Sequence, residues 1–338
     1  MIIKSHLNFI RYCKLNGLPS ILVIFIFVSL QGFAQSKKIT SSALKLREIQ
    51  KQYRLDPKST LLSRIAVTPD DIIGKFQDTG MSPTEHQLTK DEIKTISAAF
   101  AALPALHQQV LRQHLKSISF LDNMPNTALT SPVTKDEGIN LYHITFRAGI
   151  LHQTISDWVT EKERTCFKAG DSTITISVQA GLLSALTYIM LHEGTHVVDG
   201  SLHLIAADTV GGQPRPNSFT KRFAQGIWKN INTHEWPVTD SIVLKSRFRP
   251  GGRPFRTSEA KKVYTGLSQT PFVSLYSTAS WHEDLAELLT VYHLTNTFKQ
   301  PFRIVVKQNG REIFGYEPLN SGLIKKRVGL LIRFYKNH

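Results

Sequence analysis

The residue types and spacing that most directly imply chemistry lie in residues 191–199, which read Leu-His-Glu-Gly-Thr-His-Val-Val-Asp. If residues 180–199 form a helix, His192 and His196 share one face, where both imidazoles can bind one metal ion. Glu193, beside them, can take a proton from a water whose pKa a zinc ion lowers from about 15.7 to about 7. The pattern therefore predicts zinc-dependent hydrolysis; the alternative is a core helix whose histidines are only structural.

A catalytic zinc site also needs a third protein ligand and an open position. The best candidate is Glu283, because Glu283 and Glu287 stand four positions apart and would share one face of a second helix. Glu283 can then bind the metal while Glu287 accepts a hydrogen bond from the far ring nitrogen of a ligand histidine. Ser280 and Glu283 also match a capping box, which leaves a purely structural role for Glu283 open. Asp199 either orients a ligand histidine or only ends its helix.

Residues outside these two segments narrow the choice of zinc site. The metzincin pattern requires glycine and histidine where this chain has Asp199 and Leu202, and it requires a methionine downstream. All four methionines precede His196, so that pattern is excluded. Several histidines lack ligand spacing and are expected to be structural, namely His107, His114, His143, His152 and His293.

Both segments together resemble a known family of metallopeptidases. The resemblance is carried by His192, Glu193, His196, Asp199, Tyr276, Glu283, Ala286 and Glu287. In this arrangement the chain is similar to the gluzincins, in particular to the catalytic domain of anthrax lethal factor and related bacterial peptidases, over roughly residues 174–295. The resemblance implies that Glu283 is the third zinc ligand and that Tyr276 stabilises the developing oxyanion. The chain departs from the family at Thr195, where a small residue is usual between the ligands.

The elements that must position these residues indicate an α+β, zincin-like fold: a small twisted sheet packed on the helix that carries the pentad, with a mainly helical C-terminal part. Strands are predicted at residues 117–121, 142–146 and 172–178, and the edge strand of their sheet can pair with a substrate backbone. Asn309 and Gly310 predict a hairpin between residues 302–307 and 311–316. Residues 158–164 are interpreted as a surface helix end. Further helices are predicted at residues 89–103, 104–115, 280–295 and 322–335.

The N-terminal residues predict export. Residues 1–34 combine basic residues, an uninterrupted apolar run and small residues up to Ala34, which is the pattern of a signal peptide cleaved after Ala34. We therefore expect a secreted or periplasmic protein without a stable membrane span after cleavage. Residues 35–88 are polar and are interpreted as a mobile or peripheral lead-in, and residues 89–338 as the metallopeptidase domain. Cys166 is the only cysteine beyond the signal, so the mature chain forms no internal disulfide.

The charge of the chain bears on its partners. A formal net charge of +15 favours acidic partners, but an exported chain without a nucleic-acid-binding motif is not expected to bind nucleic acid. Residues 245–256 interleave basic residues with phenylalanine. This loop is either a solvated surface segment or a border of the cleft that selects acidic or carboxylate-bearing substrates through Arg247, Arg249 and Arg253.

Taken together, these patterns predict an exported zinc metallopeptidase that binds one Zn²⁺ per chain and cleaves peptide or protein substrates. Two alternatives stay open at this stage. One is a non-catalytic exported binding protein whose zinc site is structural or vestigial. The other is a zinc amidase that acts on a cell-wall peptide. The oligomeric state does not follow from the sequence.

Overall fold

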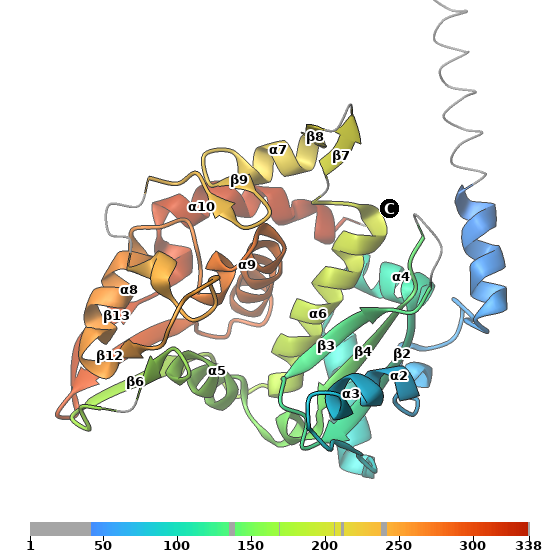
Figure 1. Ribbon diagram of the computed structural model, residues 1–338, viewed down its shortest axis with the longest axis horizontal. Coiled ribbons are helices and arrows are strands. Elements are labelled where there is room, and N and C mark those ends of the chain that lie inside the picture. Colours follow the sequence, from blue (N-terminus) through green and yellow to red (C-terminus); the bar gives the residue numbers. More distant parts are fainter. Residues whose placement is uncertain are drawn as a thin grey trace, which may run out of the picture. The chain divides into compact units, whose positions relative to one another are not determined.

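The computed structural model describes residues 42–134, 139–168, 170–205, 207–210, 213–237 and 242–336. The predicted signal peptide and its cleavage site at Ala34 lie outside these residues. The backbone divides into two units, residues 1–54 and 55–338. The described part of the first unit contains a helix at residues 42–52. All remaining elements belong to the second unit, which has an α+β fold (Figure 1).

Residues 55–88 are part of the second unit rather than a lead-in outside it. They form a 3₁₀ turn at Leu61–Arg64, helix α2 at Asp70–Gln77 and strand β1 at Thr84–Glu85. Leu61 and Ile72 are buried in hydrophobic clusters. The polar composition of this segment did not reveal that a few apolar residues pack it into the core.

A four-stranded sheet has the strand order β1-β2-β4-β3. The parallel pair β2 (Leu115–Asp122) and β4 (Tyr142–Arg147) forms its centre, close to the two predicted strands. Strand β3 (Ala128–Pro132) pairs antiparallel with β4 and forms one edge of the sheet. The sequence did not predict β3, because it is short and contains Pro132, which a sheet tolerates only at an edge.

The third predicted strand joins a different sheet. Strand β6 (Ile174–Gln179) pairs with β12 (Arg303–Gln308), which pairs with β13 (Arg311–Tyr316), all antiparallel. The expectation that one sheet contains all three strands before the pentad is therefore wrong: the residue pattern of a strand does not name its partner. The hairpin prediction is confirmed, since Asn309 and Gly310 have φ angles of 50° and 78°.

The helices that surround the pentad follow the predicted segments closely. Helix α3 (Lys90–Ala101) begins with the predicted capping box, in which Thr89 and Glu92 bond reciprocally, and α4 (Ala105–His114) begins after Pro104. Helix α6 (Ala185–Leu202) starts later than predicted. Residues 180–184 connect it to β6, and Ser184 caps it by accepting a hydrogen bond from the N–H of Leu186.

The segment after α6 mixes helices with short strand pairs, so it is less helical than predicted. Its helices are α7 (Ser218–Ala224), α8 (Ala260–Ser268), α9 (Trp281–Asn296) and α10 (Gly322–Val328), and the last of these continues as a 3₁₀ helix at Gly329–Phe334. Further 3₁₀ turns in this segment lie at Val243–Lys245, Thr257–Glu259, Tyr276–Thr278 and Pro318–Asn320, and one more, at Ala148–His152, precedes α5 (Ile155–Arg164). Two short strand pairs lie within this segment, β7 (Ala207–Val210) with β8 (Gln213–Pro216) and β9 (Trp228–Asn230) with β10 (Thr233–His234), and its strand β11 (Phe255–Arg256) pairs with β5 (Phe167–Lys168), which precedes α6.

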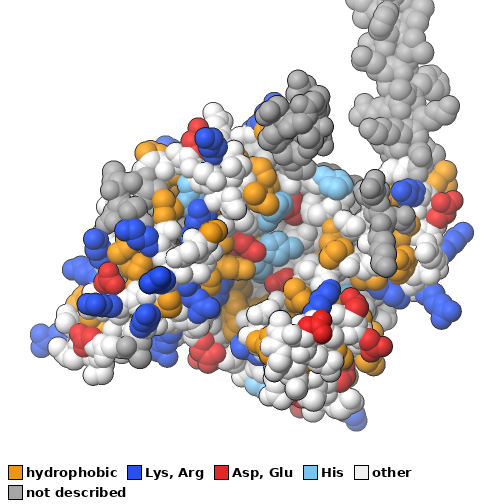
Figure 2. All heavy atoms as spheres, viewed as in Figure 1, with side chains coloured by type: hydrophobic (Ala, Val, Ile, Leu, Met, Phe, Trp, Pro, Cys, Tyr) orange, Lys and Arg blue, Asp and Glu red, His pale blue; other side chains and the backbone are white. Residues whose placement is uncertain are grey.

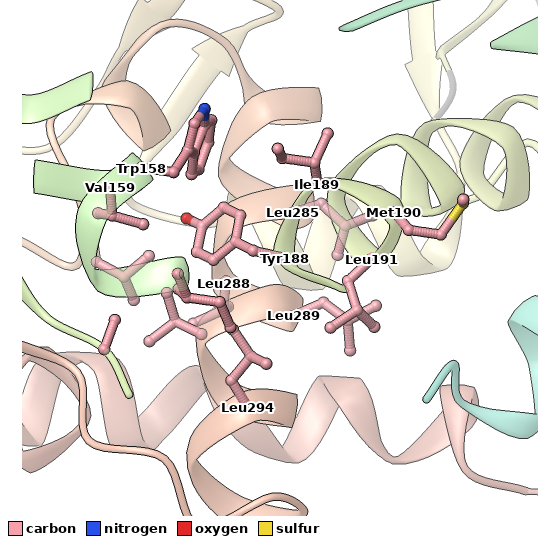
Figure 3. Packing of buried hydrophobic residues seen from close by; sticks show 14 of the residues in the cluster. Trp158, Val159, Tyr188, Ile189, Met190, Leu191, Leu285, Leu288, Leu289 and Leu294 are labelled. Carbon is pink, nitrogen blue, oxygen red and sulfur yellow. The ribbon is translucent and has the colours of Figure 1, made fainter. Parts of the chain in front are cut away.

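Helix α6 lies between the edge strand β3 and helix α9 (Figure 1). Apolar side chains of α5 (Ile155–Arg164), α6 and α9 pack together around Tyr188 (Figure 3). Leu191 and Leu288 are fully buried there, and each such side chain contributes about 2–3 kcal/mol on burial. None of the helices in the described residues is both long and apolar enough to cross a membrane.

Candidate metal centre

The two histidines of the pentad lie within α6, far from its ends. His192 is 6 % exposed and His196 is half-buried, and their rings meet edge to face with centroids 4.9 Å apart. The Nε2 atoms of the two rings lie 3.2 Å from each other. The helical spacing therefore directs both nitrogens to one point in space.

Glu283 supplies an oxygen at the same point. Its Oε2 lies 3.0 Å from Nε2 of His192 and 3.4 Å from Nε2 of His196. Tetrahedral zinc with bonds of about 2.0–2.2 Å places neighbouring ligand atoms about 3.3–3.5 Å apart, close to these separations. His192, His196 and Glu283 are thus a possible metal-binding triad, brought together from α6 and the first turn of α9.

Ser280 and Glu283 form only one of the two hydrogen bonds of a capping box. Ser280 accepts a hydrogen bond from the N–H of Glu283 at 3.2 Å and so caps α9. The Glu283 carboxylate does not return a bond to the cap; it faces the two histidines instead. One residue therefore serves the helix through its backbone and the triad through its side chain.

Glu287 and Lys162 continue the arrangement behind His192. Oε1 of Glu287 lies 3.1 Å from Nδ1 of His192, and the same oxygen accepts a hydrogen bond from Nζ of Lys162 at 2.9 Å. The other oxygen accepts one from Ser274 at 2.6 Å. Glu287 is completely buried, so these contacts fix the carboxylate and with it the orientation of the His192 ring.

The electrostatics of this cluster suit a cation. Burial disfavours charge on His192, but its contacts with Glu283 and Glu287 outweigh burial and raise its pKa to about 10. Burial likewise opposes ionisation of Glu287, yet Lys162 and His192 lower its pKa to about 2. Anionic carboxylates thus surround the imidazoles, which is a favourable setting for a divalent ion.

Glu193 lies next to the triad and opens onto the cleft. Its Oε2 accepts a hydrogen bond from the hydroxyl of Thr130, on edge strand β3, at 2.5 Å. Glu193 is half-buried and lines both cavities on either side of the triad. A strand that the sequence did not predict therefore holds the predicted base.

Tyr276 also reaches the triad. Its ring stacks on His192 with centroids 5.7 Å apart, meets Phe248 edge to face at 4.9 Å, and lies 4.3 Å from Nζ of Lys162. Burial, followed by the carboxylates of Glu283 and Glu193, raises the pKa of Tyr276 well above its usual value. The phenol therefore keeps its proton and can donate a hydrogen bond into the cleft.

Asp199 fits neither of its two predicted roles fully. Its Oδ2 lies 2.6 Å from Nδ1 of His282, and its Oδ1 accepts a hydrogen bond from the N–H of Ile205 at 2.7 Å. Asp199 thus helps to end α6, but the histidine that it orients is His282 rather than a member of the triad. The helical periodicity could not show this, because His282 belongs to α9.

Thr195, between the two histidines of the pentad, contacts helix α4. Thr195 is fully buried, donates a hydrogen bond to the carbonyl of Leu191, and lies 3.0 Å from Nε2 of His107 on α4. A Cβ at Gly194 would lie 3.1 Å from the His107 ring. His107 thus packs against the back of α6, away from the triad, and burial lowers its pKa to about 3.

The cleft extends to both sides of Glu193 and Tyr276. One cavity of about 510 Å³ lies toward α5 and Phe248, and a second of about 690 Å³ lies toward Tyr142 and His282. Figure 2 shows histidine and acidic side chains close together in a hollowed part of this face. The triad is therefore accessible from solvent.

Of the three arginines through which the basic loop could border the cleft, only Arg247 lines a cavity. Arg247 lines the first cavity, but Arg249 donates to the carbonyls of Thr278, Ala279 and Asn232 and so has a structural role. Arg253 is exposed and lines neither cavity.

Several residues of the cleft were not assigned to the site from the sequence, among them Arg147, Thr130, Lys162 and His282. Lys162 was assigned to a surface helix end, but its side chain is only 14 % exposed. A signal for it existed, since Trp158 and Lys162 stand four positions apart and share a helix face. Thr130 and Arg147 carry no comparable signal, because only strand pairing brings them to the cleft.

The chain matches no protein-family model, no curated protein and no solved structure.

Proposed function

We propose that this protein is a zinc-dependent metallopeptidase with a zincin-like, gluzincin arrangement of its site. The observation that carries the proposal is the convergence of His192 Nε2, His196 Nε2 and Glu283 Oε2, with Glu193 beside them in an open cleft. A buried structural zinc site is commonly closed by four protein ligands, whereas this set has three and faces solvent.

The donor set fits zinc. Two imidazole nitrogens and one carboxylate oxygen are ligands that zinc prefers, and His192, His196 and Glu283 would hold the ion. When bound, zinc lowers the pKa of water and polarises a carbonyl group. Glu287 and Lys162 would keep the His192 ring in the orientation that binding requires.

The residues of the chain divide the remaining work. Glu193 takes the proton of the attacking water and later delivers it to the leaving amine. Thr130 holds the Glu193 carboxylate by its hydroxyl and limits the orientations of that side chain. Tyr276 donates its phenolic proton as a hydrogen bond to the oxyanion that develops from the carbonyl.

The edge of β3 is where we place the substrate backbone. Ala128, Leu129 and Thr130 line the second cavity, and within the described residues β3 has a neighbouring strand on one side only. An extended peptide can add to such an edge through backbone hydrogen bonds. It would then pass in front of Glu193, which Thr130 already contacts.

Export of the protein is part of the proposal and rests on the signal pattern of residues 1–34. A protein or peptide outside the cytoplasm is the corresponding substrate. Cell-wall peptide as a substrate would use the same site residues with a different specificity.

Two measurements on the purified chain test the proposal. We expect one zinc per chain in the wild type and a greatly reduced zinc content in Glu283→Ala. We also expect the zinc-loaded wild type to cleave members of a peptide library that Glu193→Gln leaves intact while still binding zinc. A chain that takes up no zinc contradicts the proposal. Zinc without turnover of any peptide or cell-wall fragment favours a non-catalytic binding protein.

A further inference from the structure

The cleft has two arms that differ in charge, and both begin at Glu193 and Tyr276. The arm toward α5 and Phe248, here called the basic arm, is lined by the cationic residues Arg147, Lys162 and Arg247 and by the apolar side chains of Trp158, Ile189 and Phe248. The lining of the other arm contains no lysine or arginine among the residues that the structure describes. The two sides of the candidate site therefore face a substrate with different electrostatics.

The three cations of the basic arm are not equivalent. Lys162 is paired with the buried carboxylate of Glu287 at 2.9 Å, so its charge is compensated. Arg247 donates to the backbone carbonyl of Thr165 at 3.0 Å, and no ion pair joins Arg147 or Arg247 to a carboxylate in the described part of the chain. Two guanidinium groups thus keep their charge available.

The carboxylates of the same arm are already engaged. Glu161, at the exposed rim, accepts a hydrogen bond from Gln153 at 2.8 Å, and Glu193 accepts one from Thr130 at 2.5 Å. Both bonds come from neutral donors, and neither carboxylate forms an ion pair with Arg147 or Arg247 among the described residues. Arg147 and Arg247 are therefore the groups left to meet an incoming anion.

The placement of the two arginines matches their use on a peptide. Arg147 is half-buried at the end of β4, and its backbone N–H bonds to the carbonyl of Thr127, just before edge strand β3. Arg247 is exposed at the rim, and its guanidinium lies 5.7 Å from the centroid of the Phe248 ring. Trp158, Ile189 and Phe248 line the same arm, and a guanidinium attracts a carboxylate more strongly beside apolar side chains than in open water.

From these contacts we infer that the basic arm binds the carboxylate side chain of an aspartate or glutamate near the cleaved bond, held by Arg147 and Arg247. The inference rests on the proposed function and names the substrate class of that site: acidic peptides. Of the three loop arginines considered from the sequence, only Arg247 then contacts the substrate. Arg147, which lies outside that loop, is the second substrate-binding residue.

Paired quenched peptides test the inference. Each position next to the cleaved bond is varied among Glu, Gln and Lys, and kcat/KM is measured with the zinc-loaded full chain. We expect the wild type to prefer Glu over Gln at one position by about tenfold or more, the size of a charge-assisted hydrogen bond. Arg147→Gln and Arg247→Gln should each reduce the ratio, and the double variant should bring it close to one.

Matched variants separate charge from folding. Arg253→Gln removes an exposed arginine of the same loop outside the arm and should leave the preference unchanged. Arg147→Lys and Arg247→Lys retain the charge and should keep most of it. Equal cleavage of Glu and Gln peptides by the wild type overturns the inference and leaves the proposed function standing.

The test also covers a wild type that cleaves no peptide, in which case the proposed function fails. Binding of fluorescein-labelled Glu and Gln peptide mixtures, measured by anisotropy, then decides the inference. Tighter binding of the Glu mixture by the wild type and by Arg253→Gln, lost in the double variant, supports it. Equal binding of the Glu mixture by the wild type and the double variant overturns it.

Discussion

Helices α6 and α9 both supply atoms to the triad and both pack through buried apolar side chains, but α9 also carries fully buried carboxylates near its start. Helix α6 is packed on apolar side chains: Leu186, Leu191, Val197 and Val198 are all fully buried. Helix α9 carries two fully buried carboxylates, Asp284 and Glu287, in its first turns. The histidines thus stand on a helix fixed by packing, and Glu283 stands on one fixed in addition by buried charge.

The buried carboxylates of α9 form ion pairs with residues that are distant in the sequence. These pairs are here called the charged anchor of α9. Asp284 pairs with Arg327 at 2.6 Å and accepts a hydrogen bond from Trp228 at 2.8 Å. Glu287 pairs with Lys162 on α5. Such pairs do little for net stability compared with apolar packing, but removal of one partner leaves a costly buried charge. The position of Glu283 therefore depends on ion-pair partners of α9 that lie far away in the sequence, whereas the histidines depend mainly on the packing of α6.

The largest expected effect concerns the chemistry carried by α6. Glu193→Gln removes the proposed base without changing the size of the side chain, and general-base catalysis contributes about 10²–10⁴-fold to rate. We expect kcat to fall by about that factor while zinc content stays at the wild-type level. Steady-state kinetics and elemental analysis measure the two quantities. Loss of zinc together with activity would instead assign Glu193 a role in holding the site.

Unfolding experiments compare the apolar packing of α6 with the buried ion pairs of α9. Arg327→Met leaves Asp284 buried without its cation, and we expect a loss of about 3–5 kcal/mol in the free energy of unfolding. Leu191→Ala on α6 should cost about 2–5 kcal/mol through the cavity it leaves.

The double variant Asp284→Asn with Arg327→Met sharpens the comparison, because asparagine keeps an acceptor for the N–H of Trp228. Both charges are then removed, so it should recover most of the stability lost in Arg327→Met. Urea unfolding measures all three variants. If Arg327→Met costs no more than an exposed substitution such as Lys261→Met, the idea of a charged anchor for α9 is wrong.

The free energy of unfolding should depend on pH through a buried carboxyl group close to the ion pair between Lys162 and Glu287. Glu163, next to Lys162 on α5, is buried; burial raises its pKa to about 7, although Tyr264 donates to it and Lys162 lies near. The folded protein therefore binds a proton that the unfolded chain releases near pH 4.5, the ordinary value. Stability should fall as the pH rises from about 4.5 to about 7.

Glu163→Gln isolates this contribution, because glutamine keeps an acceptor for Tyr264 without titrating. We expect the stability of the wild type relative to this variant to fall across that window by up to about 3 kcal/mol. Urea unfolding at a series of pH values measures the difference. A difference that does not change with pH would mean that Glu163 titrates normally in the folded protein.

The smallest expected effect is on metal binding by the groups behind His192. Glu287→Gln and Lys162→Met should each weaken zinc affinity by about 10–100-fold, because they loosen the orientation of the ring rather than remove a ligand. Competition with a chelator measures the affinity. Lys261→Met, on the exposed surface of α8, serves as the control. Unchanged zinc affinity in Lys162→Met would mean that Glu287 orients the His192 ring without help from Lys162.

The candidate site was predictable where spacing along one helix decides it. His192, Glu193 and His196 fall on one turn of α6, and Glu283 and Glu287 on one turn of α9, so a local repeat was enough to group each set. Turn and cap residues likewise located the hairpin at Asn309-Gly310 and the start of α3. The functional roles of these residues remain predictions for the experiments above.

By itself, then, the amino-acid sequence determined the local elements and the side chains that each helix presents together, since helical period and capping act over a few residues. Only the tertiary structure decided which elements meet. It placed β6 with β12 instead of β2, turned Asp199 toward His282, and brought Thr130, Lys162 and Arg147 to the cleft. These contacts join residues far apart in the chain through packing and buried charge, which leave no periodic pattern in the sequence.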